Sequence, residues 1–215
     1  MKKCGGNGPL VFSSILFGLL SLVFVVFFIM LFLWSDGISA SLSRIALSEN
    51  RLPATLTVFG RSSYSQRVGS LGEGDMNTLS ARIDFFTAEG AVAGTVERSW
   101  SGWELKLDCI IIGTGKGWIV FPFMAYTDET KRGGGVNLFR YYTKNGFPVL
   151  YESSALLPEE RSNLKRLFSI IRTEQWMPGV LGSFHHETVS IRSFEAGIPY
   201  SLYVTKEGKL QLRSN

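Results

Sequence analysis

The run from Pro9 to Trp34 is the feature of this sequence that most limits its architecture. Its twenty-six residues include no charged side chain, and Lys2 and Lys3 lie shortly before it. A helix of this length measures about 39 Å at roughly 1.5 Å per residue, whereas the hydrocarbon core of a bilayer is about 30 Å thick. We therefore predict that residues 9–34 form a transmembrane anchor in contact with the lipid bilayer, preceded by a short tail at residues 1–8.

A cleaved signal peptide is the alternative interpretation of this N-terminus, because Ser39 and Ala40 are small residues of the kind found at cleavage sites. However, the apolar region of a signal peptide is only about 7 to 15 residues long. Ile38 also stands where cleavage after Ala40 would require a small residue. We favour a retained anchor, and secretion after cleavage is kept as the alternative.

The flanks of the run bear on its orientation. Two lysines before it are matched by Arg44 and Arg51 after it, but the N-terminal flank is short and a long domain can cross a membrane regardless of its own charge. We predict a single-pass membrane protein with a cytoplasmic N-terminus and an extracytoplasmic main domain. Ser14 and Gly18 form a small-xxx-small pair that could join two anchors in a homodimer. Ionisable residues are absent from the run, which favours an anchor over a transport pathway.

The charge balance of the remaining chain argues against nucleic acid as a partner. Two of the 22 Lys and Arg residues precede the run, so 20 basic residues stand beside 18 acidic ones after it. Such a balance gives no basic surface for phosphate backbones. We expect no nucleic-acid partner and instead an envelope protein or an apolar ligand.

Alternation of apolar and polar residues predicts that the chain after residue 54 is rich in β-strands. The expected strands cover residues 56–58, 79–85, 92–96, 105–111, 118–125, 188–194, 200–204 and 210–213. Short turn-forming segments, including Ser99–Gly102, predict consecutive hairpins, whereas residues 61–77 are expected to form a longer loop. Residues 35–53 are expected to connect the anchor to this domain.

One amphipathic helix is predicted from Pro158 to about Arg172. Proline suits the first helical position, and acidic residues at the start and basic residues at the end complement the helix dipole. Leu164, Leu167, Phe168 and Ile171 fall on one face. The predicted fold class is therefore α+β: an N-terminal transmembrane helix, then a β-rich domain at residues 54–215 in which a twisted antiparallel sheet carries one packed helix.

Several motifs that resemble functional sites do not predict one. His185 and His186 are adjacent, so in a strand their rings point to opposite faces and cannot share a metal ion with Glu187. Ser162 and Lys165 match S-x-x-K without its partner motifs. Gly113–Gly117 lacks the helix and the ending of a phosphate loop. Cys109 falls on the apolar face of a strand. We predict no catalytic residue, no metal site and no cofactor.

Aromatic residues are the remaining candidates for a site. Trp103, Trp118, Phe121, Phe123 and Tyr141 lie in or near the predicted hairpins and could line an apolar cavity inside a curved sheet, although core packing explains them equally well. The sequence predicts an anchored, noncatalytic binding or structural domain. The alternatives are a secreted protein that binds lipids or apolar ligands, and an enzyme whose site is assembled from separated loops.

Overall fold

The computed structural model describes residues 17–26, 42–46, 51–67, 73–130, 134–173 and 185–214. The chain divides into two compact units, Met1–Ile38 and Ser39–Asn215. In the first unit, residues 17–26 are helical. Within the described part of the chain, every helix is too short or too polar to traverse a membrane. The rest of the predicted anchor, Ser14 and the tail at residues 1–8 lie outside the described residues, so the anchor and its pairing stay predictions.

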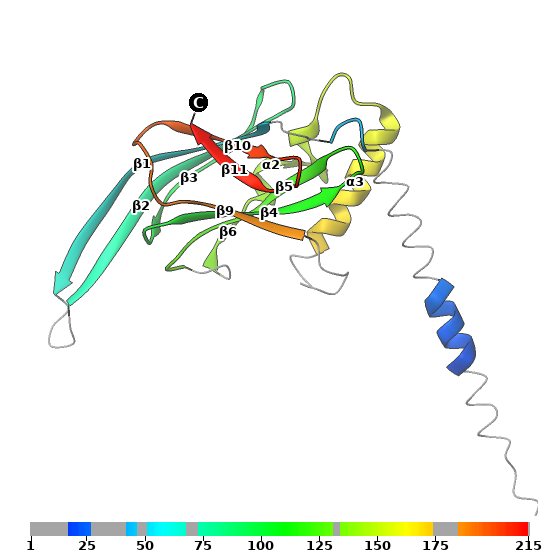
Figure 1. Ribbon diagram of the computed structural model, residues 1–215, viewed down its shortest axis with the longest axis horizontal. Coiled ribbons are helices and arrows are strands. Elements are labelled where there is room, and N and C mark those ends of the chain that lie inside the picture. Colours follow the sequence, from blue (N-terminus) through cyan, green and yellow to red (C-terminus); the bar gives the residue numbers. More distant parts are fainter. Residues whose placement is uncertain are drawn as a thin grey trace, which may run out of the picture. The chain divides into compact units, whose positions relative to one another are not determined.

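The second unit is mostly β-structure, and its larger sheet has five antiparallel strands in the order β11-β10-β1-β2-β3 (Figure 1). These strands are β1 (Arg51–Arg67), β2 (Glu73–Phe86), β3 (Val92–Ser101), β10 (Pro199–Val204) and β11 (Leu210–Ser214). The predicted alternation in β2 is confirmed, because Leu79, Ile83 and Phe85 are buried while Arg82 is exposed. The buried face of this sheet is one wall of the core.

A second antiparallel sheet has the order β6-β5-β4-β9. Its strands are β4 (Leu105–Gly113), β5 (Trp118–Thr127), β6 (Val136–Asn137) and β9 (His185–Ile191). Strand β5 contacts β3, and β9 contacts β11, so the two sheets pack against each other. A two-stranded sheet of β7 (Thr143–Lys144) and β8 (Phe147–Pro148) completes the described strands.

Strand β5 is buried on both faces, as its continuous apolar sequence predicts, and it accommodates Pro122 at a bulge. Asp108 pairs with Met124 but the next residue, Cys109, pairs with Pro122, so Phe123 is the extra residue. The outer edge of β5 is covered by phenol groups here. Tyr142 donates to the carbonyl of Pro122 at 2.7 Å, and the Tyr151 hydroxyl bonds the N–H and the carbonyl of Val120. Pro122 has no N–H to donate, and its carbonyl at this edge of the strand accepts from Tyr142.

Two expectations about the sheet were wrong. The strands form two larger sheets rather than one, and β3 and β4 are not a hairpin, because β3 pairs with β2 whereas β4 pairs with β5 and β9. The turn at Ser99–Gly102 instead passes the chain from one sheet to the other. Gly102 has a φ of 125°, and a Cβ there would lie 2.5 Å from the Asp128 carboxylate. A tight glycine turn suits both connections, so its sequence does not distinguish them.

Residues 61–77 are also not the expected loop. Strands β1 and β2 continue pairing from Arg61 opposite Leu79 to Arg67 opposite Glu73. Neither β10 nor β3 accompanies them beyond Thr57 and Thr78, so the outer part is a two-stranded ribbon that extends from the domain (Figure 1). The register is held by backbone hydrogen bonds, which a segment rich in serine and glycine can form without an alternating pattern.

The predicted helix is confirmed as α3 (Pro158–Thr173), and its apolar face is packed. Phe168 is fully buried, with ring centroids 5.4 Å from Phe121 of β5 and 5.2 Å from Phe139. Phe139 belongs to α2 (Phe139–Tyr142), which lies between the two larger sheets: Tyr142 contacts Phe85 of β2, and Phe139 contacts Phe123 of β5. Aromatic side chains thus fill the space between α3 and the sheets.

Candidate functional site

A pocket of about 760 Å³ opens where four segments of the domain meet. They are the turn at residues 42–46, the start of β1, the loop between β2 and β3, and the region of η3 (Val149–Tyr151) with the loop after it. We call it the Arg44 pocket; it is lined by Arg44, Ile45, Leu52, Pro53, Phe86, Thr87, Ala88, Gly90, Leu150, Tyr151, Ser153, Ala155 and Leu156. Its size falls in the range of small-molecule sites, about 300 to 1,000 Å³.

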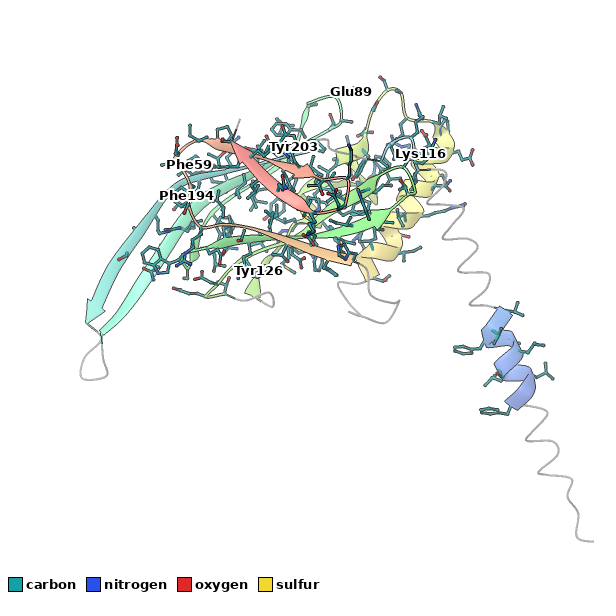
Figure 2. All side chains as sticks on the ribbon, viewed as in Figure 1. Phe59, Glu89, Lys116, Tyr126, Phe194 and Tyr203 are labelled. Carbon is teal, nitrogen blue, oxygen red and sulfur yellow. The ribbon has the colours of Figure 1, made fainter. Side chains whose placement is uncertain are left out.

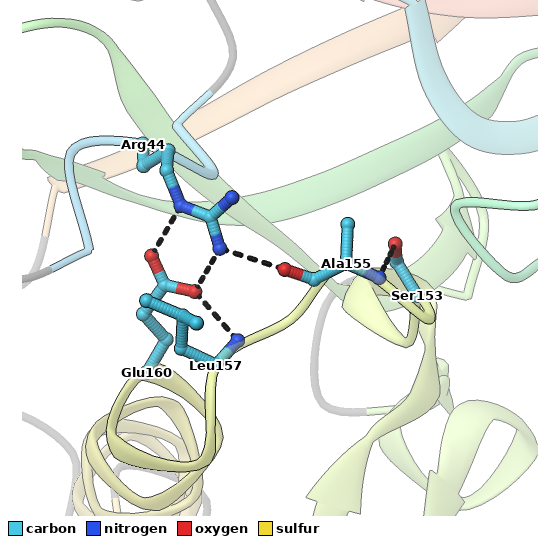
Figure 3. Close-up of polar contacts among 5 residues, drawn as sticks. All are labelled: Arg44, Ser153, Ala155, Leu157 and Glu160. Carbon is cyan, nitrogen blue, oxygen red and sulfur yellow. Dashed lines mark hydrogen bonds and ion pairs between the residues drawn. The ribbon is translucent and has the colours of Figure 1, made fainter.

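The first wall of the Arg44 pocket comes from the expected connector. Leu42 and Leu52 are fully buried, and β1 begins at Arg51, so the described residues of this connector, 42–46 and 51–53, are folded onto the domain. Arg44 fixes it there (Figure 3). Its Nε donates to Oε1 of Glu160 at 2.7 Å, its Nη2 donates to Oε2 of the same carboxylate, and Nη2 also donates to the carbonyl of Ala155 at 2.8 Å. Such two-point contacts between a guanidinium and a carboxylate fix orientation as well as distance.

Glu160 joins this wall to the start of α3. It is the third helical residue, and its Oε2 accepts a hydrogen bond from the N–H of Leu157 at 2.9 Å, as in one half of a capping box. The Glu160 side chain is only 7% exposed. The hydrogen bond from Arg44, helped by the one from Leu157, lowers the pKa of Glu160 in spite of its desolvation. Glu160 is therefore charged at neutral pH, and Arg44 is held by a fixed anion.

The opposite wall is the loop between β2 and β3, on which Figure 2 labels Glu89. The Glu89 carboxylate accepts a hydrogen bond from the N–H of Ser154, which ties this loop to the segment after η3. That bond lowers the pKa of Glu89. Gly90 has a φ of 88°, which glycine adopts without strain, and its N–H donates to Thr87. Two ionised carboxylates, Glu89 and Glu160, thus fasten the segments that enclose the Arg44 pocket.

The lining of the Arg44 pocket is mainly apolar. Its side chains include Ile45, Leu52, Phe86, Leu150 and Leu156. The phenol of Tyr151 is engaged with Val120 of β5, and burial raises its pKa, so it stays neutral. The guanidinium of Arg44 is already neutralised by Glu160. This lining suits an apolar ligand with a small polar group at the edge.

The five aromatic candidates lie in different places. Phe121 is fully buried against Tyr151 and Phe168, and Phe123 packs on Phe139 and on the His186 ring. The indole of Trp118 donates to the carbonyl of Lys206 at 2.9 Å, and Tyr141 lies beneath the guanidinium of Arg140. None of these four lines any of the three described pockets.

Trp103, the fifth candidate, lines a smaller pocket of about 420 Å³ with Glu104, Asp128, Arg61 and Arg192. The Arg61 guanidinium lies 4.9 Å from the Trp103 ring and 5.1 Å from the Phe194 ring. It also donates to the carbonyls of Trp103 and Arg192. Arg61 thus fastens the base of the β1–β2 ribbon to two loops. Trp103 takes part in this contact through its ring and its carbonyl.

The histidines sit on opposite faces of β9, as the strand period predicts. His185 lies 3.7 Å from the Glu187 carboxylate, whereas His186 turns toward the buried Asp108, at 3.4 Å, and toward Phe123. Among the described residues, no three His, Cys, Asp or Glu side chains are grouped as metal ligands. Cys109 is fully buried, and burial raises the pKa of its thiol, with Asp108 and Glu187 adding to the effect. Its predicted burial is confirmed.

Sequence reasoning missed the residues that build the Arg44 pocket. Arg44 and Glu160 are 116 positions apart, and Glu89 and Ser154 are 65 apart. The one local indication is the acidic start of α3, and the helix dipole alone already accounts for acidic residues there.

No protein-family model, no curated protein and no solved structure matches this chain.

Proposed function

We propose that the protein is a single-pass membrane protein whose residues 9–34 anchor it in the bilayer, with the N-terminus in the cytoplasm. Its main domain is extracytoplasmic and noncatalytic, and it binds an apolar ligand in the Arg44 pocket. The observation that carries this proposal is the construction of that pocket. Its lining is mainly apolar, and one wall is the segment that follows the predicted anchor. The fixed ion pair between Arg44 and Glu160 keeps that wall in place.

The position of the wall in the sequence supports a ligand that comes from the membrane. Leu42 lies eight positions after Trp34 in the sequence. An extended chain of that length reaches at most roughly 28 Å. This covalent limit makes molecules that partition into the bilayer or its surface the candidate ligands of the proposal. A fatty acid or the chain of a lipid has the apolar character that the lining requires.

The experiment uses the full chain in membranes and a photoreactive diazirine analogue of palmitic acid. After illumination, mass spectrometry of peptides should find the label on residues that line the Arg44 pocket. The Ala88→Trp variant places an indole in the pocket and should reduce that labelling at least fivefold. Ala155→Trp fills it from the other wall and gives a second test if the first variant does not fold.

Ala196→Trp is the matched control, because Ala196 is exposed and lies outside the lining of the three described pockets. Its labelling should equal that of the unchanged protein. Label confined to residues 9–34, or pocket label that neither tryptophan substitution reduces, would contradict the proposed ligand site.

A second candidate function, binding a protein partner, is favoured by the β1–β2 ribbon. Its outer residue pairs have no further strand beside them among the described elements, so both backbone edges can accept an added strand. Hydrogen exchange of the full chain, alone and with membrane proteins that copurify, would show protection of residues 61–67 and 73–77 if a partner adds a strand there.

A further inference from the structure

A second, polar pocket lies between the β7–β8 hairpin and α3. Its volume is about 250 Å³, and it is lined by Lys144, Asn145, Phe147, Val149, Glu152, Arg161 and Lys165. Three of these side chains are cationic and only Glu152 is anionic, so the lining carries an excess of positive charge. We call it the basic pocket.

The α3 cations of the basic pocket are positioned by the hairpin. The Arg161 guanidinium lies 4.3 Å from the centre of the Phe147 ring and donates to Glu152 at 3.0 Å. Gly146 has a φ of 76°, and a Cβ built there would lie 3.5 Å from Cε of Lys165. The tight Asn145-Gly146 turn, where both residues have a positive φ, therefore brings the hairpin close to the stem of Lys165.

The two lysines of the basic pocket have no anionic partner among the described residues. Glu152, the carboxylate of the lining, is bound to Arg161, and no carboxylate lies within 4.0 Å of the ammonium group of Lys144 or of Lys165 in that part of the chain. Two ammonium groups and a partly neutralised guanidinium around one small concavity attract an anion of more than one negative charge. A phosphate group carries close to two charges at neutral pH.

We propose that the basic pocket binds a phosphate group through Lys144, Lys165 and Arg161. The phosphate comes either from a soluble molecule or from the headgroup of an anionic lipid. The same short segment of the chain lines both pockets. Val149 and Glu152 line the basic pocket, whereas Leu150 and Tyr151, which lie between them in the sequence, line the Arg44 pocket. The phosphate site depends on neither the anchor nor an apolar ligand, so it can be tested separately from the proposed function.

The test titrates the full chain in a nonionic detergent with two probes, inorganic phosphate and dihexanoyl phosphatidic acid, by isothermal calorimetry. The Lys144→Gln/Lys165→Gln variant should bind the effective probe at least tenfold more weakly. Both lysines are exposed, so the variant should unfold at the same temperature as the unchanged protein. Lys116→Gln is the control, because Lys116 is an exposed lysine in the turn between β4 and β5, outside this pocket.

The two probes distinguish the source of the phosphate. Binding of inorganic phosphate that the double substitution weakens supports the site and a soluble source. Binding of phosphatidic acid alone, weakened in the same way, supports the site and a lipid source. Failure of both probes to bind, or equal affinity in the double variant and in Lys116→Gln, would overturn the proposal.

Discussion

Replacing Phe168 with alanine tests whether the space between α3 and the sheets is filled, on which the location of the ligand site depends. Phe168 is fully buried, and its ring lies 5.4 Å from Phe121, 5.2 Å from Phe139 and 6.1 Å from Tyr142. Truncation of a buried phenylalanine to alanine costs about 3 to 5 kcal/mol. Because three aromatic contacts are lost together, we expect a loss of about 4 kcal/mol in the free energy of unfolding.

Urea unfolding of the full chain in a nonionic detergent, followed by near-ultraviolet circular dichroism, measures this loss. With a slope of about 2 kcal/mol per molar urea, the midpoint should fall by about 2 M. Phe168→Leu should lose much less, and Ser169→Ala, on the exposed face of the same helix, should change the midpoint little. A loss below about 1 kcal/mol for Phe168→Ala would refute the packed interior, because only a hollow or mobile site tolerates such a truncation.

Three further predictions concern single side chains. Glu160 has a lowered folded pKa, so its stabilising effect exists above the unfolded pKa of about 4.3 and is lost as the pH falls through the folded value. Between pH 6 and pH 3 the urea midpoint should therefore fall further in the unchanged protein than in Glu160→Gln; parallel curves would contradict this. Cys109 should react with a maleimide at least about tenfold more slowly in the native protein than in urea, and equal rates would show that it is accessible. Gly208→Ala should lower stability by more than about 1 kcal/mol, because Gly208 has a φ of 80° and a Cβ there would lie 2.9 Å from the Trp118 ring, whereas an unchanged midpoint would show that the turn adapts.

The elements that the sequence predicted well are those whose pattern is local. The apolar face of α3 and the alternation in β2 follow from the helical and strand periods, and each is visible within a dozen residues. The double burial of β5 also agrees with its continuous apolar sequence, but that sequence does not show how Pro122 is accommodated. That solution requires Tyr142 and Tyr151, which reach the edge of β5 from 20 and 31 positions away.

The division into two sheets was not predictable from the turn at Ser99–Gly102. A hairpin and a crossing between sheets both require a sharp change of direction, and Gly102 provides it in either case. What decides between them is the pairing of β4 with β9, whose residues lie about 80 positions later. The β1–β2 ribbon escaped prediction for a related reason, since its register rests on backbone pairing rather than on a buried face.

The candidate site was hidden because its residues have ordinary local roles. Arg44 reads as a charge in a connector, and Glu160 reads as an acidic residue at a helix start. Only the folded chain brings them together with the loop at Glu89 to enclose an apolar pocket. The aromatic residues, in contrast, are conspicuous in the sequence because they are numerous, but Phe121 and Phe123 pack in the core.

The location of the domain relative to the bilayer is tested most directly by thiol labelling in intact cells or spheroplasts. Cys109 is buried, so the native protein offers Cys4, in the predicted cytoplasmic tail, as its reporter. Lys209→Cys adds a thiol at an exposed position in the turn before β11. A membrane-impermeant maleimide should label Lys209→Cys in intact cells and should label Cys4 only after permeabilisation. Protection of the Lys209→Cys thiol until the membrane is opened would contradict an extracytoplasmic domain.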